Sequence, residues 1–399
     1  MNRHGRILMV HGHCDRAFDT VREAFAANFA ERAETGAALS VYADGRKVVD
    51  LWGGDAGPGR PWEQDTITPV WSATKGITAL VVQRLVDTGR LGLDTPVAHW
   101  WPEFAQGGKE KITVADVLTH GARLPYPPGY AEIVTADGPE GWDRVEDLTR
   151  LLEQAEPIWP EGTHGYHSVT FGLLLNGVVR RATGSSIGAL LRDEIAGPLG
   201  IEAAWIGQPA EVEDRVAHLE LTIPPPPTDD PEILAFMAHA MSSEGSIGRS
   251  LFVGPSGAMN FTAVGNDPRF RAVEHPAANG VVDARSLARV YAALAGGGEL
   301  DGVRVVSEES IARHSAEQWH GNDATLMAEK RYALGYMLPG TPTERYGPAD
   351  KAFGHPGMGG SLGFADPGIG FGYVTRHMVF EITVDPRVDA VADAVYASL

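Results

Sequence analysis

The sequence predicts an α/β protein of the α+β type, in which an antiparallel sheet is flanked by helices from the two ends of the chain. Three observations support this fold class. A helical pattern and two β-rich runs open the chain, helical patterns dominate the middle, and glycine and β-forming residues dominate the last third before a closing helix. This order predicts one sheet built from both ends of the chain, with a large, mostly helical insertion between its strands.

The first elements are predicted by apolar spacing and by one turn signal. Four apolar residues recur at helical intervals within residues 15–32, namely Phe18, Val21, Phe25 and Phe29. Two β-rich runs over residues 37–54 then flank Asp44-Gly45, a dipeptide typical of tight β-hairpins. A helix followed by an antiparallel hairpin is therefore expected at the start of the chain.

The middle of the chain is predicted to be helical. After Thr74 the apolar residues follow one helix face, and Gly89 is expected to end that helix. Further helices are expected over residues 114–118, 145–155, 171–182, 187–195, 284–295 and 389–398. Residues 124–143 are expected to form a long ordered loop and residues 223–231 an extended break, because both are rich in proline.

We predict a division into three segments from this pattern. Residues 1–70 and 276–399 would form the α/β domain, and residues 71–275 would form the mostly helical domain.

Composition limits the partners of this protein. Acidic residues exceed basic ones, 52 to 33, which disfavours nucleic acids and anionic membrane surfaces and leaves a small-molecule substrate as the expected partner.

Cys14 is the only cysteine, so no intrachain disulfide is possible, and the apolar stretch 7–10 is too short for a signal peptide. A cytoplasmic location is therefore expected, and the oligomeric state stays open.

Ser72-Ala73-Thr74-Lys75 is the sharpest chemical feature of the sequence. Residues three apart share a helix face, so the Lys75 amine can reach the Ser72 hydroxyl and serve as its base if burial lowers the amine pKa. The helix start also offers unpaired N–H groups where negative charge develops. A capping serine beside a surface lysine is the alternative interpretation of this common motif.

Three longer stretches give this motif a context, namely WSATKGITALVVQRLVDTGRLGLDTPVAHWWPEF, ITVADVLTHGARLP and GHPGMGGSLGFADP. Together they resemble the serine β-lactamase and penicillin-binding-protein superfamily, most of all the class C β-lactamases and the family VIII carboxylesterases. The resemblance runs from about residue 15 to about residue 375.

The resemblance implies roles for several residues. Ser72 would be the nucleophile, Lys75 its proton partner, and Tyr166 the base for acylation and the acid toward the leaving group. We expect the lysine ammonium to lower the Tyr166 pKa. The backbone N–H groups of Ser72 and Met358 would form the oxyanion hole. The resemblance implies no cofactor and no metal.

Two departures from the family pattern bear on the substrate. Ser168 stands in place of the family's asparagine, and His355-Pro356-Gly357 replaces its Lys-Thr-Gly element. Both changes weaken the expected grip on a lactam carboxylate, so esters become the predicted substrates. The candidate substrate-binding residues are Ser168, His355, Gly357 and His120. His120 is also interpreted as a buried, hydrogen-bonding histidine that supports the site. Aromatic residues near the predicted rim could line an apolar pocket, although core packing explains them equally well: Tyr126, Tyr130, Trp142 and Trp159.

Other motifs compete with Ser72 for a catalytic role. Ser186 and Ser361 each lie in a Gly-x-Ser-x-Gly pattern, but neither has the strand before it and the helix after it that an α/β-hydrolase nucleophile needs. His11-Gly12-His13-Cys14-Asp15 imitates a metallohydrolase motif, and a helix cap at Asp15 with exposed histidines is the preferred interpretation.

The sequence thus predicts a serine hydrolase of small carboxylic esters, with weak β-lactam hydrolysis as a possible side activity. An acyltransferase, an amidase of the β-lactamase or D,D-peptidase type, and a non-catalytic penicillin-binding-like sensor stay open as alternatives.

Overall fold

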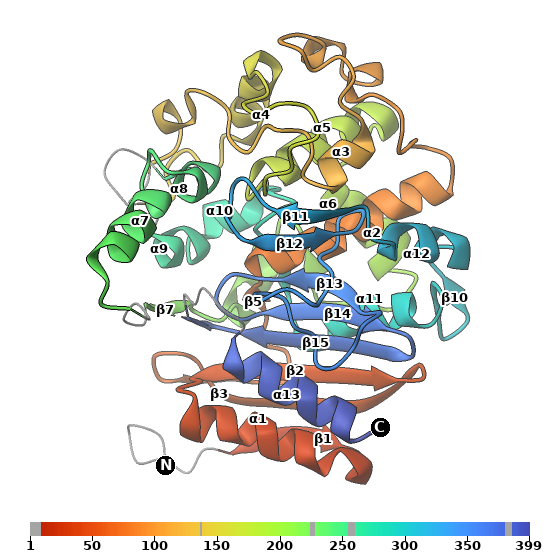
Figure 1. Ribbon diagram of the computed structural model, residues 1–399. Coiled ribbons are helices and arrows are strands. Elements are labelled where there is room, and N and C mark those ends of the chain that lie inside the picture. The colour runs from red at the N-terminus through yellow and green to blue at the C-terminus, as the bar shows by residue number, and fades with distance from the viewer. Residues whose placement is uncertain (1–8, 136–137, 224–227, 254–259, 380–384) are drawn as a thin grey trace.

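A central antiparallel sheet joins the two ends of the chain. The computed structural model describes residues 9–135, 138–223, 228–253, 260–379 and 385–399. The sheet order is β1-β3-β2-β15-β14-β13, with a short β4 paired to β3 (Figure 1). The strands are β1 Val10–Cys14, β2 Gly36–Ala43, β3 Arg46–Gly57, β4 Arg60–Pro61, β13 Phe353–Pro356, β14 Leu362–Asp366 and β15 Ile369–Thr375. The predicted fold class is confirmed.

The first hairpin forms where the sequence predicted it. Asp44 and Gly45 both have positive φ angles, 47° and 75°, and connect Ala43 directly to its partner Arg46. Two central residues with positive φ suit the right-handed twist of the strands they connect. The β2 strand then pairs along its length with β15, so residues more than three hundred positions apart are neighbours at the centre of the sheet.

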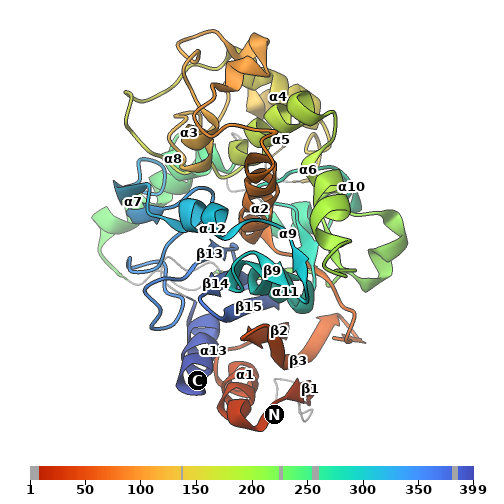
Figure 2. The same ribbon diagram turned by 90° about the vertical axis from the view of Figure 1, so that its right-hand side faces the viewer.

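Helices cover both faces of the sheet. The terminal helices α1 (Asp19–Glu31) and α13 (Pro386–Ala397) pack together on one face, and α11 (Ala284–Ala295) covers the other (Figures 1 and 2). The close approach of α11 requires glycine on β15. A Cβ atom at Gly370 or Gly372 would lie 2.4 or 2.6 Å from a backbone nitrogen of α11.

The segment between the two halves of the sheet is mostly helical, as predicted. It contains α2 Thr74–Asp87, α3 Val114–Leu118, α4 Val145–Gln154, α5 Thr170–Thr183, α6 Ile187–Leu190, α7 Pro231–Met241, α8 Ser246–Ser250, α9 Phe261–Gly265 and α10 Pro268–Ala272. Short strands β5 Thr68–Pro69, β6 Ala204–Trp205 and β8 Val281–Val282 form a small sheet beneath it. The remaining pairs are β7 Glu220–Thr222 with β16 His377–Val379, and β9 Glu299–Leu300 with β10 Val303–Arg304. Helix α12 spans Glu308–Ser315, and β11 Trp319–Asn322 pairs with β12 Glu329–Tyr332.

The start of the chain differs from the prediction. The motif His11–Asp15 falls largely in strand β1, which pairs with β3 as an edge strand, so a strand precedes the first helix. Asp15 does not cap that helix, because its carboxylate accepts hydrogen bonds from His13 and Arg46. The two histidines are exposed, as expected.

Two predicted features are only partly covered by the structure. Residues 136–137 of the long loop and residues 224–227 of the proline-rich break lie outside the described residues. Elsewhere the long loop contains a 3₁₀ turn at Tyr130–Glu132. The domain boundaries at residues 70 and 275 stay a prediction. Across the described ranges, no helix combines the length and apolar character needed to cross a bilayer.

Candidate active site

Ser72 lies at the entrance of helix α2. It belongs to a 3₁₀ turn, Trp71–Ala73, that leads directly into the helix, and it is partly exposed while its neighbours are buried. Trp71 adopts a left-handed φ of 48°, which is strained for a residue with a side chain. Its indole N–H donates to the Met378 sulfur at 3.2 Å, and its ring packs edge-on against Phe261. The turn therefore presents the Ser72 hydroxyl from a fixed backbone.

Lys75 is completely buried one turn along the helix. Its Nζ lies 3.1 Å from Ser72 Oγ, and it donates to the carbonyl oxygens of Ser168 and Ala277 at 2.8 and 2.9 Å. Burial lowers the pKa of the Lys75 amine far below its usual range. A neutral amine has two N–H groups and one lone pair. In the neutral form, with the two carbonyls taking both N–H groups, the lone pair would face the Ser72 hydroxyl.

Tyr166 faces Lys75 from a distant loop. Its ring centroid lies 4.8 Å from Lys75 Nζ, and the Ser72 side chain is close enough to act on the pKa of its phenol. The structure therefore brings together the three groups that the sequence predicted to share a proton.

The predicted direction of the Tyr166 pKa shift is wrong. Burial raises the pKa of the Tyr166 phenol, and hydrogen bonding with Ser72 opposes this rise only in part. The expected effect of a lysine ammonium fails because Lys75 is itself buried without a counter-ion among its partners, which disfavours its charged form. Burial thus disfavours the charged form of both groups, which favours a basic lone pair on Lys75 and a proton on Tyr166.

Asp323 fixes the Tyr166 loop and was not singled out from the sequence. Its Oδ1 accepts the Tyr166 backbone N–H at 3.0 Å, and its Oδ2 accepts the Tyr332 hydroxyl at 2.7 Å. The same carboxylate accepts the N–H groups of Thr325 and Leu326, which makes a local turn between β11 and β12. Aspartate is typical of such turns, but that signal does not reveal a partner more than 150 positions away.

His120 lies behind Tyr166. Its backbone is left-handed, with φ of 62°, and its Nδ1 accepts the His167 backbone N–H at 3.1 Å. Its ring lies 4.7 Å from the Tyr166 ring and 4.8 Å from the Tyr332 ring, centroid to centroid. Burial lowers the pKa of His120 well below its usual value. The ring is therefore a neutral support for Tyr166, and its role in substrate binding stays a prediction.

Ser168 and His355 occupy the positions at which this chain departs from the family pattern. The Ser168 hydroxyl is paired with the Ser250 hydroxyl at 2.7 Å. His355 is buried, its ring centroid lies 6.1 Å from that of Tyr166, and burial together with Lys75 lowers its pKa to about 3. Neither position offers a positive charge at neutral pH.

The turn after β13 closes against the nucleophile. A Cβ atom at Gly357 would lie 2.1 Å from the Val70 carbonyl oxygen, so only glycine allows this approach. The Gly357 N–H donates to the Ser361 carbonyl at 2.6 Å, and the Gly360 N–H donates to the Gly357 carbonyl at 3.1 Å. Met358 lies within this turn, the catalytic turn of residues 357–361.

The two competing serines have structural roles. Ser361 is buried in the catalytic turn, where its Oγ accepts the Thr375 N–H at 3.3 Å. Ser186 is the N-cap of α6, and its Oγ accepts the Ala189 N–H at 3.2 Å. In the part of the chain that the structure describes, no three His, Cys, Asp or Glu side chains gather closely enough to hold a metal ion.

The four aromatic candidates separate into different environments. Tyr126 and Tyr130 line a cavity of about 390 Å³ together with Arg249, whose guanidinium lies 4.0 Å from the Tyr126 ring centroid. Trp142 is core, stacked on Phe252. Trp159 is partly exposed and covers Gly165, the residue before Tyr166: a Cβ there would lie 2.3 Å from its ring.

Comparison with known proteins identifies the family of this chain. A family model described as Beta-lactamase matches residues 21–394. The chain belongs to the beta-lactamase family. Within that family, it is 37% identical to the esterase/beta-lactamase LipL of Mycobacterium tuberculosis, over 92% of this chain and 82% of LipL. It is a serine hydrolase, as predicted.

Solved structures of family members share the whole fold. A family VIII carboxylesterase has a TM-score of 0.85 at 35% identity, covering 98% of this chain and 100% of that one. A penicillin-binding protein homologue from Caulobacter crescentus has a TM-score of 0.83 at 38% identity, with the same coverage of 98% and 100%. The predicted superfamily is confirmed.

Proposed function

We propose that this serine hydrolase cleaves small carboxylic esters through a transient acyl-enzyme on Ser72. The observation that carries the proposal is the buried Lys75 Nζ, which lies 3.1 Å from Ser72 Oγ and 2.8 and 2.9 Å from the carbonyl oxygens of Ser168 and Ala277. A neutral amine in this position is a base for the hydroxyl proton, which answers the need of a serine nucleophile.

Acylation follows from the placement of the three groups. Ser72 Oγ attacks the ester carbonyl carbon, and its proton passes to the Lys75 lone pair. The Tyr166 phenol then gives its own proton to the departing alkoxide and regains one from the Lys75 ammonium. The C–O bond to the alcohol breaks, and the acyl group stays on Ser72. Proton transfer of this kind contributes about 10²–10⁴ in rate.

Deacylation reverses the proton path. Water attacks the acyl carbon, loses a proton to the Tyr166–Lys75 pair, and the carboxylic acid leaves as Ser72 recovers its proton. In both steps the carbonyl oxygen becomes negative. We assign its stabilisation to the backbone N–H groups of Ser72 and Met358, each worth about 3 kcal/mol.

Esters are favoured over β-lactams by the groups that surround Ser72. A lactam carboxylate needs a cation or free hydrogen-bond donors, and His355 is neutral because its pKa is lowered to about 3. The Ser168 hydroxyl is already paired with Ser250. An uncharged ester needs neither.

Covalent labelling tests this proposal. A fluorophosphonate should add to the intact protein once, with the label mapping to Ser72, and Ser72→Ala should abolish both the label and p-nitrophenyl butyrate hydrolysis. Ser186→Ala is the matched control, since it removes another serine hydroxyl at a helix start but leaves the site intact. A label on Ser361, or retained hydrolysis in Ser72→Ala, would overturn the assignment.

Substitutions at Lys75 and Tyr166 test the separate role of each residue in proton transfer. Lys75→Met and Tyr166→Phe should each lower the acylation rate by at least a hundredfold. An unchanged rate in Tyr166→Phe would remove the phenol from the mechanism. Adding an alcohol or amine during turnover measures how the acyl group partitions between water and other acceptors.

A cytoplasmic location remains part of the proposal. Its support is the single cysteine, Cys14, which fits a reducing compartment.

A further inference from the structure

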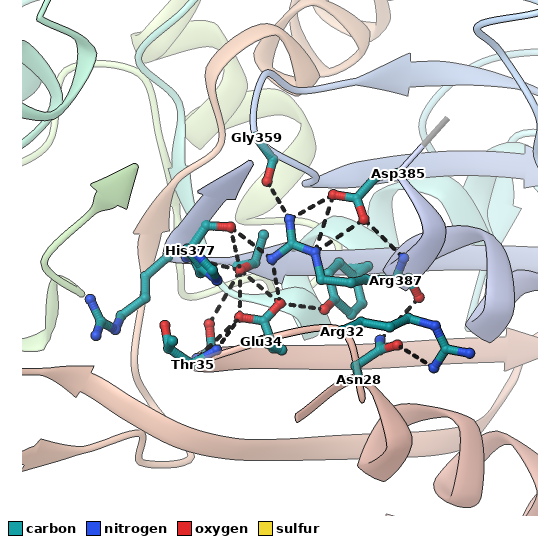
Figure 3. A network of polar contacts seen from close by, with 12 residues as sticks. Asn28, Arg32, Glu34, Thr35, Gly359, His377, Asp385 and Arg387 are labelled. Atoms are coloured by element: carbon teal, nitrogen blue, oxygen red, sulfur yellow. Dashed lines mark hydrogen bonds and ion pairs between the residues drawn. The ribbon is translucent and has the colours of Figure 1, made fainter. Parts of the chain in front are cut away.

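A buried ion pair lies behind the catalytic turn. Arg387 Nη1 donates to Glu34 Oε2 at 2.9 Å, and the two side chains are 1% and 0% exposed (Figure 3). Glu34 follows helix α1, and Arg387 lies in the first turn of α13. The pair therefore ties the two terminal helices together beneath the sheet.

Arg387 uses every N–H of its guanidinium. Nη1 also donates to the His377 carbonyl at 2.8 Å. Nε and Nη2 both donate to the Asp385 carboxylate, at 3.0 and 2.6 Å. The last N–H, on Nη2, donates to the Gly359 carbonyl at 2.8 Å. A guanidinium has five donors in a rigid plane, so these partners fix its position and orientation.

Glu34 is fixed equally well. Its carboxylate accepts hydrogen bonds from the Tyr373 hydroxyl at 2.8 Å and from the Thr375 hydroxyl at 2.9 Å. The backbone N–H groups of Thr35 and Gly36 add two more, at 2.8 and 3.1 Å. Breaking a buried pair of this kind leaves an uncompensated charge. Arg387 and Glu34, which together reach Gly359, are therefore held in fixed positions.

The catalytic turn has no free space on either side of Met358. On the nucleophile side, Gly357 is pressed against the Val70 carbonyl. On the other side, Gly359 has a φ of 88°, and a Cβ there would lie 2.5 Å from the Met378 Cβ. A Cβ at Gly360, which has a φ of 115°, would lie 2.6 Å from Arg387 Nη2. A shift of Arg387 would therefore move the turn.

We propose that Arg387 is a positioning residue for the oxyanion hole. By holding the Gly359 carbonyl from behind, it fixes the turn in which the Met358 N–H points at the substrate carbonyl oxygen. Arg387 touches no reacting atom, and Glu34 and Asp385 hold its guanidinium in place. This inference rests on the proposed function, because it assigns the Met358 N–H to the oxyanion.

An ester and its thionoester provide a readout specific to the oxyanion. Sulfur in place of the carbonyl oxygen is larger and a weaker acceptor, so well-aimed N–H donors favour the oxygen compound. The ratio of kcat/KM for phenyl butyrate to that for phenyl thionobutyrate cancels the fraction of folded enzyme. Arg387→Lys keeps a cation beside Glu34 but loses the planar fork. Removing one oxyanion-hole donor lowers kcat by about 10²–10³. Arg387→Lys would misplace the donor without removing it, so we expect the ratio to fall by less, roughly tenfold.

Asp389→Asn is the matched control. Asp389 also lies on α13, and its carboxylate forms an ion pair with Arg345, which lies outside the catalytic turn. Its ratio should equal that of the wild type. An unchanged ratio in Arg387→Lys, or an equal fall in Asp389→Asn, would overturn the inference.

A second variant covers failure to fold. If Arg387→Lys does not fold, Asp385→Asn replaces it in the test. This substitution keeps the Arg387 charge but weakens the hydrogen bonds that Nε and Nη2 donate to residue 385, so the ratio should fall about threefold. An unchanged ratio would again overturn the inference. Fluorophosphonate labelling of the same preparations separates the two hypotheses. A label on Ser72 with an unchanged ratio refutes only the role of Arg387, whereas labelling elsewhere refutes the proposed function.

Discussion

Buried histidines should make this fold sensitive to mild acid. Burial is the main cause that lowers the pKa of His167 and His355 to about 3 and that of His275 and His314 to about 4. In the unfolded chain these rings have the ordinary histidine pKa near 6.5. Below that pH these rings bind protons in the unfolded chain but stay unprotonated in the folded protein. The free energy of unfolding therefore falls as the pH drops.

The magnitude follows from the gap between the folded and unfolded pKa values. At pH 5 all four rings are still neutral in the folded protein, and the unfolded state gains about 2 kcal/mol from each, since one pH unit corresponds to about 1.4 kcal/mol. Four rings together give about 8 kcal/mol, comparable with the 5–15 kcal/mol that stabilises a typical domain. We therefore expect the protein to lose most of its stability between pH 7 and pH 5, before the carboxylates titrate.

Urea unfolding followed by circular dichroism at pH 7 and pH 5 measures this loss. His314→Asn keeps a donor for the Ser310 carbonyl but cannot be protonated, so its loss between the two pH values should be about 2 kcal/mol smaller than that of the wild type. His11→Gln, which removes an exposed ring, is the control and should behave as the wild type. Equal losses in His314→Asn and in the wild type would refute the reasoning.

Three further predictions concern the site. The value of kcat/KM should fall as the pH is lowered and the Lys75 amine becomes protonated, because only the neutral form of this amine is a base and burial lowers its pKa. A value of kcat/KM independent of pH would contradict this. Asp323→Asn should lower kcat/KM by about tenfold to a hundredfold with little change in KM, since it loosens the Tyr166 loop, and a changed KM alone would argue against this role. Gly357→Ala should lower the acylation rate at least a hundredfold in a folded protein, because its Cβ would lie 2.1 Å from the Val70 carbonyl; wild-type acylation would show that the turn can yield.

The sequence predicted the fold wherever the signal is local or carried by motifs. Apolar periodicity predicted α2, and Asp44-Gly45 predicted the β2–β3 hairpin, because both depend on neighbouring residues. The motif Ser72–Lys75 and the family resemblance, which implied the role of Tyr166, predicted which groups meet. The family match over residues 21–394 confirms the predicted family.

What the sequence did not predict depends on distant contacts. Strand β1 has too few apolar residues to be recognised and forms because β3 offers a free edge. Asp323 and Arg387 act on the site from other elements, and no spacing in the sequence indicates their partners. The Tyr166 pKa was predicted in the wrong direction because the cost of burial cannot be evaluated before the packing is known.

The pairing of β2 with β15 has a consequence for how the enzyme comes into being on the ribosome. Ser72 and Tyr166 emerge before the strands that complete the sheet and before the turn that bears Met358. Such long-range pairing slows folding, because a large loop must close before its contacts form. A nascent chain that already holds the nucleophile and its base is therefore expected to stay inactive until residues 353–375 have left the ribosome and paired with β2.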